Sequence, residues 1–93
     1  MPRHYLFPRT IFASRPGIIR QLLHVFSEFM EIITALLRRD YEHACHECYD
    51  LIGSVETLIH KLYIVAHARK KPIQPLIIKL AVEEKNRKRG YYA

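Results

Sequence analysis

Apolar residues recur at alternating steps of three and four along two long stretches of the chain, and this period constrains its fold most. From Ile18 onward, the first row is Ile19, Leu22, Phe26, Phe29, Ile33 and Leu36. The second row is Tyr41, Cys45, Cys48, Ile52, Val55, Ile59, Leu62 and Ala66. Steps of three and four place residues on one face of an α-helix. The sequence therefore predicts two long helices, the second of which runs to about Ala68.

The residues between these rows indicate a tight reversal. Arg38 and Arg39 suit the negative end of a helix dipole, and Asp40 is a good N-cap for the second helix. At the start of the first helix, Ser14 offers a capping hydroxyl ahead of Pro16. Because the connection is short, we expect the two helices to lie antiparallel as a hairpin.

Two prolines, Pro72 and Pro75, end the second helix, and a shorter third helix is predicted from Pro75 to about Lys88. The predicted fold class is all-α, an antiparallel helical hairpin plus a short third helix. We divide the chain into an extended basic and aromatic arm (1–14), the hairpin (15–68), and a basic segment with the third helix and tail (69–93).

Both long helices are apolar around much of their circumference, and a chain of 93 residues buries only a modest share of its surface. Pairing with each other cannot hide these faces, so we predict self-association into at least a dimer or a larger assembly, most simply two hairpins in a four-helix bundle. The residues predicted to mediate it are Leu22, Phe26, Phe29, Ile33, Ile52, Val55, Ile59 and Leu62.

The segment HACHEC, residues 43–48, looks at first like a metal site. On a helix its side chains point in different directions, at about 100° per residue, and no second cysteine pair exists to complete a tetrahedral zinc site. We therefore predict no metal and no cofactor, and expect Cys45 and Cys48 to be buried thiols packed at a helix interface.

Three imidazole and carboxylate pairs, each four residues apart, could also suggest a metal-binding bundle. They are His24/Glu28, His43/Glu47 and Glu56/His60. By the helical period they fall on the polar sides of the helices. We interpret them as solvated pairs that stabilise the helices.

Charge is unevenly distributed along the chain. Residues 1–20 hold four basic and no acidic residues, residues 21–65 hold three basic and seven acidic, and residues 66–93 hold eight basic and two acidic. Basic residues interleaved with aromatic ones suit nucleic acid, because cations meet phosphates while rings stack on bases. The predicted contacts to RNA or DNA are Arg3, Arg9, Arg69, Lys70, Lys71, Lys85, Arg87, Lys88 and Arg89.

An alternative is based on Arg38 and His43, which are separated by four residues, and on Arg39 and His46, separated by six. This spacing resembles the Arg-x4-6-His motif of HEPN ribonucleases, small helical proteins that form a composite site on dimerisation. The resemblance implies that Arg38 would stabilise the phosphate and His43 would assist attack by the ribose hydroxyl. A guanidinium and an imidazole are chemically suited to these roles.

No run of 18 apolar residues lacks charges, so no membrane span is predicted. The N-terminal segment does not resemble a secretory signal, and the two cysteines are expected to stay reduced. We expect a cytoplasmic location or one within a nucleoprotein particle.

The preferred function is that of a non-enzymatic, nucleic-acid-associated structural protein of a nucleoprotein assembly, of the virion nucleoprotein or ribosome-associated type. The alternatives are a dimeric HEPN-like ribonuclease and a helical protein-interaction module without nucleic acid.

Overall fold

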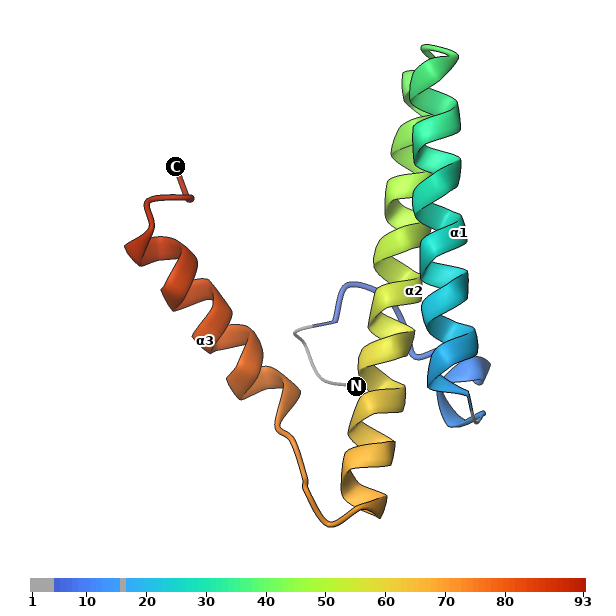
Figure 1. The fold of residues 1–93 in the computed structure, drawn as a ribbon. Coiled ribbons are helices and arrows are strands. Elements are labelled where there is room, and N and C mark those ends of the chain that lie inside the picture. The colour runs from blue at the N-terminus through green and yellow to red at the C-terminus, as the bar shows by residue number, and fades with distance from the viewer. Residues whose placement is uncertain (1–4, 16) are drawn as a thin grey trace.

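The computed structural model describes residues 5–15 and 17–93, and these are helical without strands. A 3-10 helix, η1 (Ile11–Ser14), precedes the three α-helices α1 (Ile18–Leu37), α2 (Tyr41–Ala68) and α3 (Pro75–Lys88). Figure 1 shows α1 and α2 side by side and antiparallel, whereas α3 diverges from them. The predicted all-α fold, a helical hairpin plus a third helix, is confirmed. Among the described helices, none has the length and apolar character needed to cross a membrane.

The reversal between α1 and α2 is closed by backbone hydrogen bonds. Asp40 N donates to Ala35 O and Arg39 N donates to Leu36 O, each at 3.0 Å, and Arg39 has a left-handed φ of 57°. This is the Schellman arrangement, which satisfies the last carbonyls of a helix. The Asp40 carboxylate then accepts from His43 N at 3.1 Å and caps α2, as predicted.

The start of α1 differs from the prediction. Ser14 is the last residue of η1, and the N-cap of α1 is Gly17, whose φ of 112° is a conformation that favours glycine. The prediction that Ser14 caps α1 is wrong, because the chain first closes a 3-10 turn in which Arg15 N donates to Phe12 O. Pro16 lies outside the described residues.

The inner face of the hairpin, where α1 and α2 pack together, combines small and polar residues with Val, Ile and Leu. Ala35 and Ala44 lie near the reversal and are 2% and 5% exposed. Gln21 Nε2 donates to Ser54 O at 2.8 Å across the other half of the hairpin. The buried and half-buried residues of this face are Gln21, Val25, Glu28, Ile32 and Ala35 of α1, and Ala44, Glu47, Leu51, Ser54, Leu58, Lys61 and Val65 of α2.

The arm, residues 5–15, lies along α2. The Glu56 carboxylate accepts from Leu6 N at 2.6 Å and from Phe7 N at 2.9 Å. The ring of Tyr5 stacks on His60 with centroids 4.2 Å apart. Burial and the negative charge of Glu56 raise the pKa of the Tyr5 hydroxyl. Glu56 and His60 were predicted to be a solvated pair, but they instead hold the arm.

Further contacts continue toward α1. The hydroxyls of Thr10 and Thr57 are 3.0 Å apart, and Lys61 Nζ donates to Arg15 O at 2.8 Å although Lys61 is buried. Ala13 of η1 is almost fully buried. The arm therefore forms a third layer on one side of the hairpin.

The third helix, α3, has no buried residue. An extended link, residues 71–74, connects it to α2, and Figure 1 shows it leading away from the hairpin. Several large apolar side chains of α3 are exposed, namely Leu76, Ile77, Ile78, Leu80 and Val82. The extensive helix contacts of the chain are those of α2 with α1 and with η1.

Candidate functional site

The described basic residues predicted to bind nucleic acid are all exposed. One group, Arg69, Lys70 and Lys71, forms the end of α2 and the turn after it. The other group is at the far end of α3 and comprises Lys85, Arg87, Lys88 and Arg89. A 14-residue helix is about 20 Å long, so the structure places these groups at the two ends of α3 rather than in one patch. Arg9 lies in the arm, and Arg3 lies outside the described residues.

The C-terminal group combines cations with exposed rings. The guanidinium of Arg89 is 6.0 Å from the centroid of the Tyr91 ring, and Tyr91 and Tyr92 are both exposed. Arg87 also pairs with Glu84 at 2.5 Å, between side chains that are both more than half exposed. An exposed pair of this kind is weak, so Arg87 can exchange this partner for a phosphate.

The residues predicted to mediate self-association form an outer apolar face on the hairpin. Leu22, Phe26 and Phe29 are 50%, 61% and 48% exposed. Each follows an inner-face residue by one position, which turns it about 100° away from the partner helix. The same offset holds on α2 for Ile52, Val55, Ile59 and Leu62. Because the helices are antiparallel, equal offsets bring both rows to the same side of the hairpin, opposite the arm.

The two cysteines belong to this outer row and are exposed in the single chain. The prediction that Cys45 and Cys48 are buried is wrong for this hairpin, because the inner face lies one residue away from the apolar period. Ala44 and Glu47 occupy the inner face in their place.

Arg38 and His43, the residues of the ribonuclease alternative, line one cavity of about 380 Å³ near the reversal. Three carboxylate residues line the same cavity, namely Glu31, Asp40 and Glu47. One guanidinium among three acidic groups makes an unfavourable environment for a phosphodiester. The other pair of the motif, Arg39 and His46, does not line this cavity.

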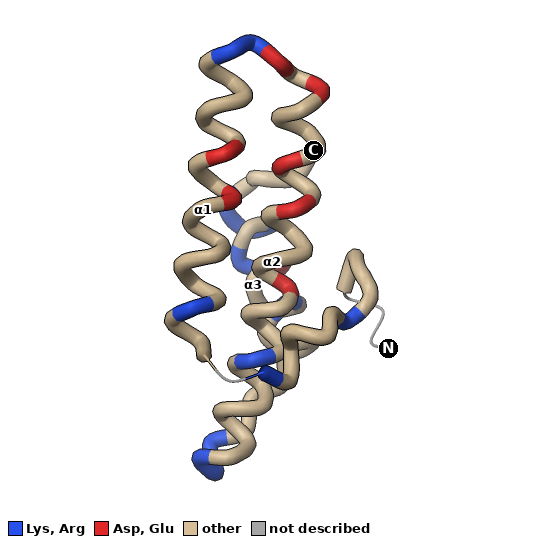
Figure 2. Tube along the Cα trace, turned by 90° about the vertical axis from the view of Figure 1, so that its right-hand side faces the viewer, with Lys and Arg blue, Asp and Glu red and all other residues tan. Residues whose placement is uncertain are grey.

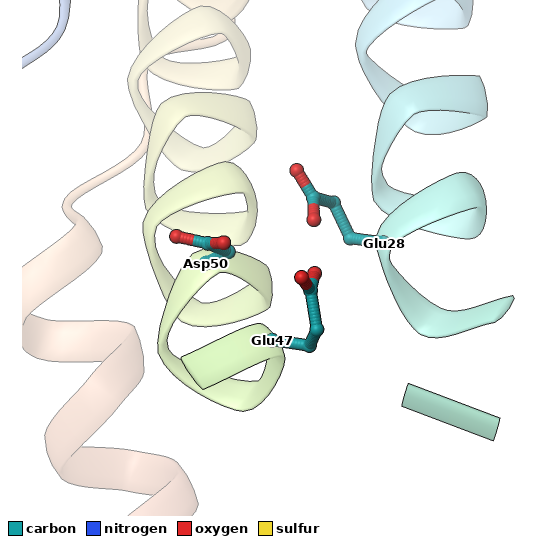
Figure 3. A group of neighbouring side chains, drawn as sticks. All are labelled: Glu28, Glu47 and Asp50. Atoms are coloured by element: carbon teal, nitrogen blue, oxygen red, sulfur yellow. The ribbon is translucent and has the colours of Figure 1, made fainter. Parts of the chain in front are cut away.

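Carboxylates from both helices converge in the middle of the hairpin. Figure 3 shows Glu28 of α1 extending toward Glu47 and Asp50 of α2. One oxygen from each of the three lies within 4.8 Å of the others. Figure 2 shows the acidic positions gathered along the hairpin, whereas basic positions lie toward its ends and on α3.

Two imidazoles flank this group. His24 Nε2 is 3.1 Å from Glu28 Oε1, and His43 Nε2 is 3.5 Å from Glu47 Oε1. The glutamate side chains are 14% and 11% exposed, whereas both histidines are more than half exposed. The prediction that these pairs are solvated on the polar sides is therefore wrong for their carboxylates, which turn into the inner face.

The proton affinity of Glu47 is unusual. A side-chain hydrogen bond with Glu31, burial, and the negative charges of Glu31 and Asp50 together raise the pKa of Glu47 to about 7, although His43 opposes the shift. Glu47 is 8% exposed, and its Oε2 has no hydrogen-bond donor among the described residues, since Glu31 is itself a carboxylate. A carboxyl poised near neutral pH is a feature of functional sites.

These histidine and glutamate pairs are predictable from the sequence, whereas their convergence is not. The four-residue spacing of each pair can be read from the sequence. Whether the pair on α1 lies close to the pair on α2 depends on the rotation of each helix about its axis. That rotation is set by the reversal and by the small residues beside it. Asp50, which completes the cluster, had no distinguishing signal in the sequence.

Comparison of the chain with protein-family models, with curated proteins and with solved structures finds no match.

Proposed function

We propose that this chain is a non-enzymatic structural protein of a nucleoprotein assembly, which associates with its own copies through the outer apolar face of the hairpin and binds RNA or DNA through its basic residues. The single observation that carries the proposal is the separation of these surfaces. The outer apolar face lies on the hairpin, whereas the described candidate contacts to nucleic acid lie in the arm, after α2 and at the end of α3.

The exposed apolar area supports the association part of the proposal. Contiguous apolar patches are uncommon on monomeric proteins and mark interaction sites. Two rows of Leu, Ile, Val and Phe on antiparallel helices match the surface that a helical bundle buries. A second copy would present the same two rows.

The exposed basic residues support the nucleic-acid part. Arg69, Lys70 and Lys71 make none of the described ion pairs, whose Lys and Arg members are Lys79 and Arg87. Unpaired cations bind phosphates by releasing counterions, without reading the sequence. A protein of this kind would package or scaffold nucleic acid in the cytoplasm or within a particle.

The structure favours this proposal over ribonuclease chemistry. The cavity that holds Arg38 and His43 is lined by Glu31, Asp40 and Glu47, and these carboxylates would repel the phosphate that Arg38 is meant to bind.

The test is the light-scattering mass of the full chain, with and without mixed RNA and DNA, at low and high salt. We expect a dimer or larger species that takes up nucleic acid at low salt and releases it at high salt. A variant with Arg87→Gln, Lys88→Gln and Arg89→Gln should reduce the slope of log affinity against log salt by about three or less. Lys79→Gln is the matched control, because Lys79 is a basic α3 residue already paired with Glu83.

A species that ignores nucleic acid at every salt concentration would refute the binding part and favour a protein-interaction module. If the wild-type chain cleaves the RNA and the Arg38→Ala and His43→Ala variants do not, the ribonuclease is favoured instead.

A further inference from the structure

We propose that Glu28, Glu47 and Asp50 form a binding site for one divalent cation, held by carboxylate oxygens between α1 and α2. The site is separate from the outer apolar face and from the basic residues of the proposed function.

The spacing of the oxygens fits one ion. Oxygen ligands lie about 2.0–2.6 Å from Mg²⁺ or Ca²⁺, so two oxygens on opposite sides of an ion are about 4–5 Å apart. The three carboxylates each offer one oxygen within 4.8 Å of the other two. Figure 3 shows that they come from both helices, with Glu28 on one side and Glu47 and Asp50 on the other.

A second, independent observation points to a ligand. Glu47 is 8% exposed, and its Oε2 is enclosed without a hydrogen-bond donor among the described residues, since the neighbouring Glu31 is itself a carboxylate. Figure 3 shows this carboxylate extending toward that of Glu28. A buried acceptor without a partner destabilises the fold. A cation among the three carboxylates would supply the missing partner.

The described Lys and Arg side chains do not neutralise this group. Lys61, the buried cation of the hairpin, donates to the backbone oxygen of Arg15, and the described ion pairs of Lys and Arg lie within α3. His24 and His43 each contact one carboxylate oxygen, Oε1 of Glu28 and Oε1 of Glu47. Partners of this kind orient ligating carboxylates toward a metal.

The site also has a route for entry. Asp50 is exposed, and it lines, with His24 and Glu28, an open cavity of about 440 Å³ between the arm and the hairpin. Carboxylate and water ligands suit Mg²⁺, Ca²⁺ and Mn²⁺. We choose Mn²⁺ as the probe, because its free and bound forms are distinguished by electron paramagnetic resonance.

The experiment titrates Mn²⁺ into the untagged full chain, freed of metal with EDTA and exchanged into buffer at pH 7.5. We expect saturable binding of one Mn²⁺ per chain. Glu47→Gln and Asp50→Asn should each weaken binding at least tenfold. Glu42→Gln, which removes an exposed carboxylate of α2 outside the cluster, should leave the affinity unchanged.

Circular dichroism of each variant shows whether the helices persist. Asp50 is exposed, so Asp50→Asn tests the site even where Glu47→Gln fails to fold. Absence of saturable binding would overturn the proposal. Equal affinities of the Asp50→Asn and Glu42→Gln variants would also overturn it, because the loss would then reflect total charge rather than this group of ligands.

Discussion

The inner and outer faces of the hairpin differ in composition, because polar and small residues share the inner face with Val, Ile and Leu, whereas the outer face is mainly apolar. The inner face buries Gln21, Glu47, Ser54 and Lys61, whereas the outer face exposes large apolar side chains such as Phe26 and Phe29. Polar groups buried between the helices contribute little to the stability of the fold unless all of them are hydrogen-bonded. Exposed apolar side chains contribute no hydrophobic stabilisation until they are removed from water. The difference teaches that the pairing of α1 and α2 leaves large apolar side chains of the hairpin in contact with water.

Two kinds of interaction follow from this comparison. The inner face determines which helix surfaces meet, through Ala35 and Ala44 near the reversal and through Gln21 and Ser54 farther along. The outer face exposes large apolar side chains that the proposed association would remove from water. Substitutions on the two faces should therefore be read out by different measurements.

The largest effect is expected on the outer face. Phe29→Asp places a charge where the proposed assembly would exclude water, and burying an unpaired charge is very unfavourable. We expect at least a tenfold rise in the protein concentration needed for association, measured by light scattering. Helix content should persist, because Phe29 is 48% exposed in the single chain.

Ser27→Asp is the control for this prediction, since Ser27 is exposed on α1 outside the apolar rows. An unchanged mass for Phe29→Asp would show that the chain associates through another surface or does not associate.

An intermediate effect is expected on the inner face beside the reversal. Ala44→Leu adds three carbons at a position that is 5% exposed, and overpacking of this kind costs about 2 kcal/mol. The free energy of unfolding, measured with urea, should fall by about that amount. Ala81→Leu, at an exposed position of α3, should change it by less than about 0.5 kcal/mol. Equal effects of the two substitutions would mean that the helices do not approach closely at Ala44.

A third effect concerns pH. The pKa of Glu47 is raised from 4.5 to about 7, so the folded chain holds a proton that the unfolded chain has lost between these values. Stability from this group is therefore greatest below pH 4.5, falls as pH rises toward 7, and is constant above it. Melting temperatures in EDTA from pH 5 to pH 8 should show this fall in the wild type and a flatter profile in Glu47→Gln.

Glu42→Gln is again the control and should keep the wild-type profile. Parallel profiles for the wild type and Glu47→Gln would contradict the raised pKa.

The helices of this protein were predictable because their signals are local. The period of three and four marked both long helices, Asp40 marked the cap of α2, and Pro72 and Pro75 marked the start of α3, all as observed. Each of these signals determines the conformation of only the few residues around it. The docking of the arm was not predictable, because it joins Leu6 to Glu56 over 50 residues.

The candidate site was predictable only in part, because its pairs lie within single helices whereas its convergence depends on how the helices pack. The spacing of His24 to Glu28 and of His43 to Glu47 could be read from one helix at a time. Whether the two glutamates face each other depends on how each helix is rotated about its axis, and one residue corresponds to about 100° of rotation. The apolar rows predict an inner face that is displaced by one residue from the observed one. Ala35 and Ala44, which are 2% and 5% exposed, lie between the helices at the observed rotation, and their close packing is defined only once the helices are paired.

The contacts that hold the arm on α2 suggest the order in which the hairpin and the arm form during folding. Its hydrogen bonds connect residues 46 to 50 positions apart, whereas the helices of the hairpin meet around a reversal of a few residues. Closing a short loop is faster than closing a long one, and the arm's acceptors on α2 are aligned only after that helix has formed. We therefore expect the arm to dock after the hairpin has formed and to detach before the hairpin opens.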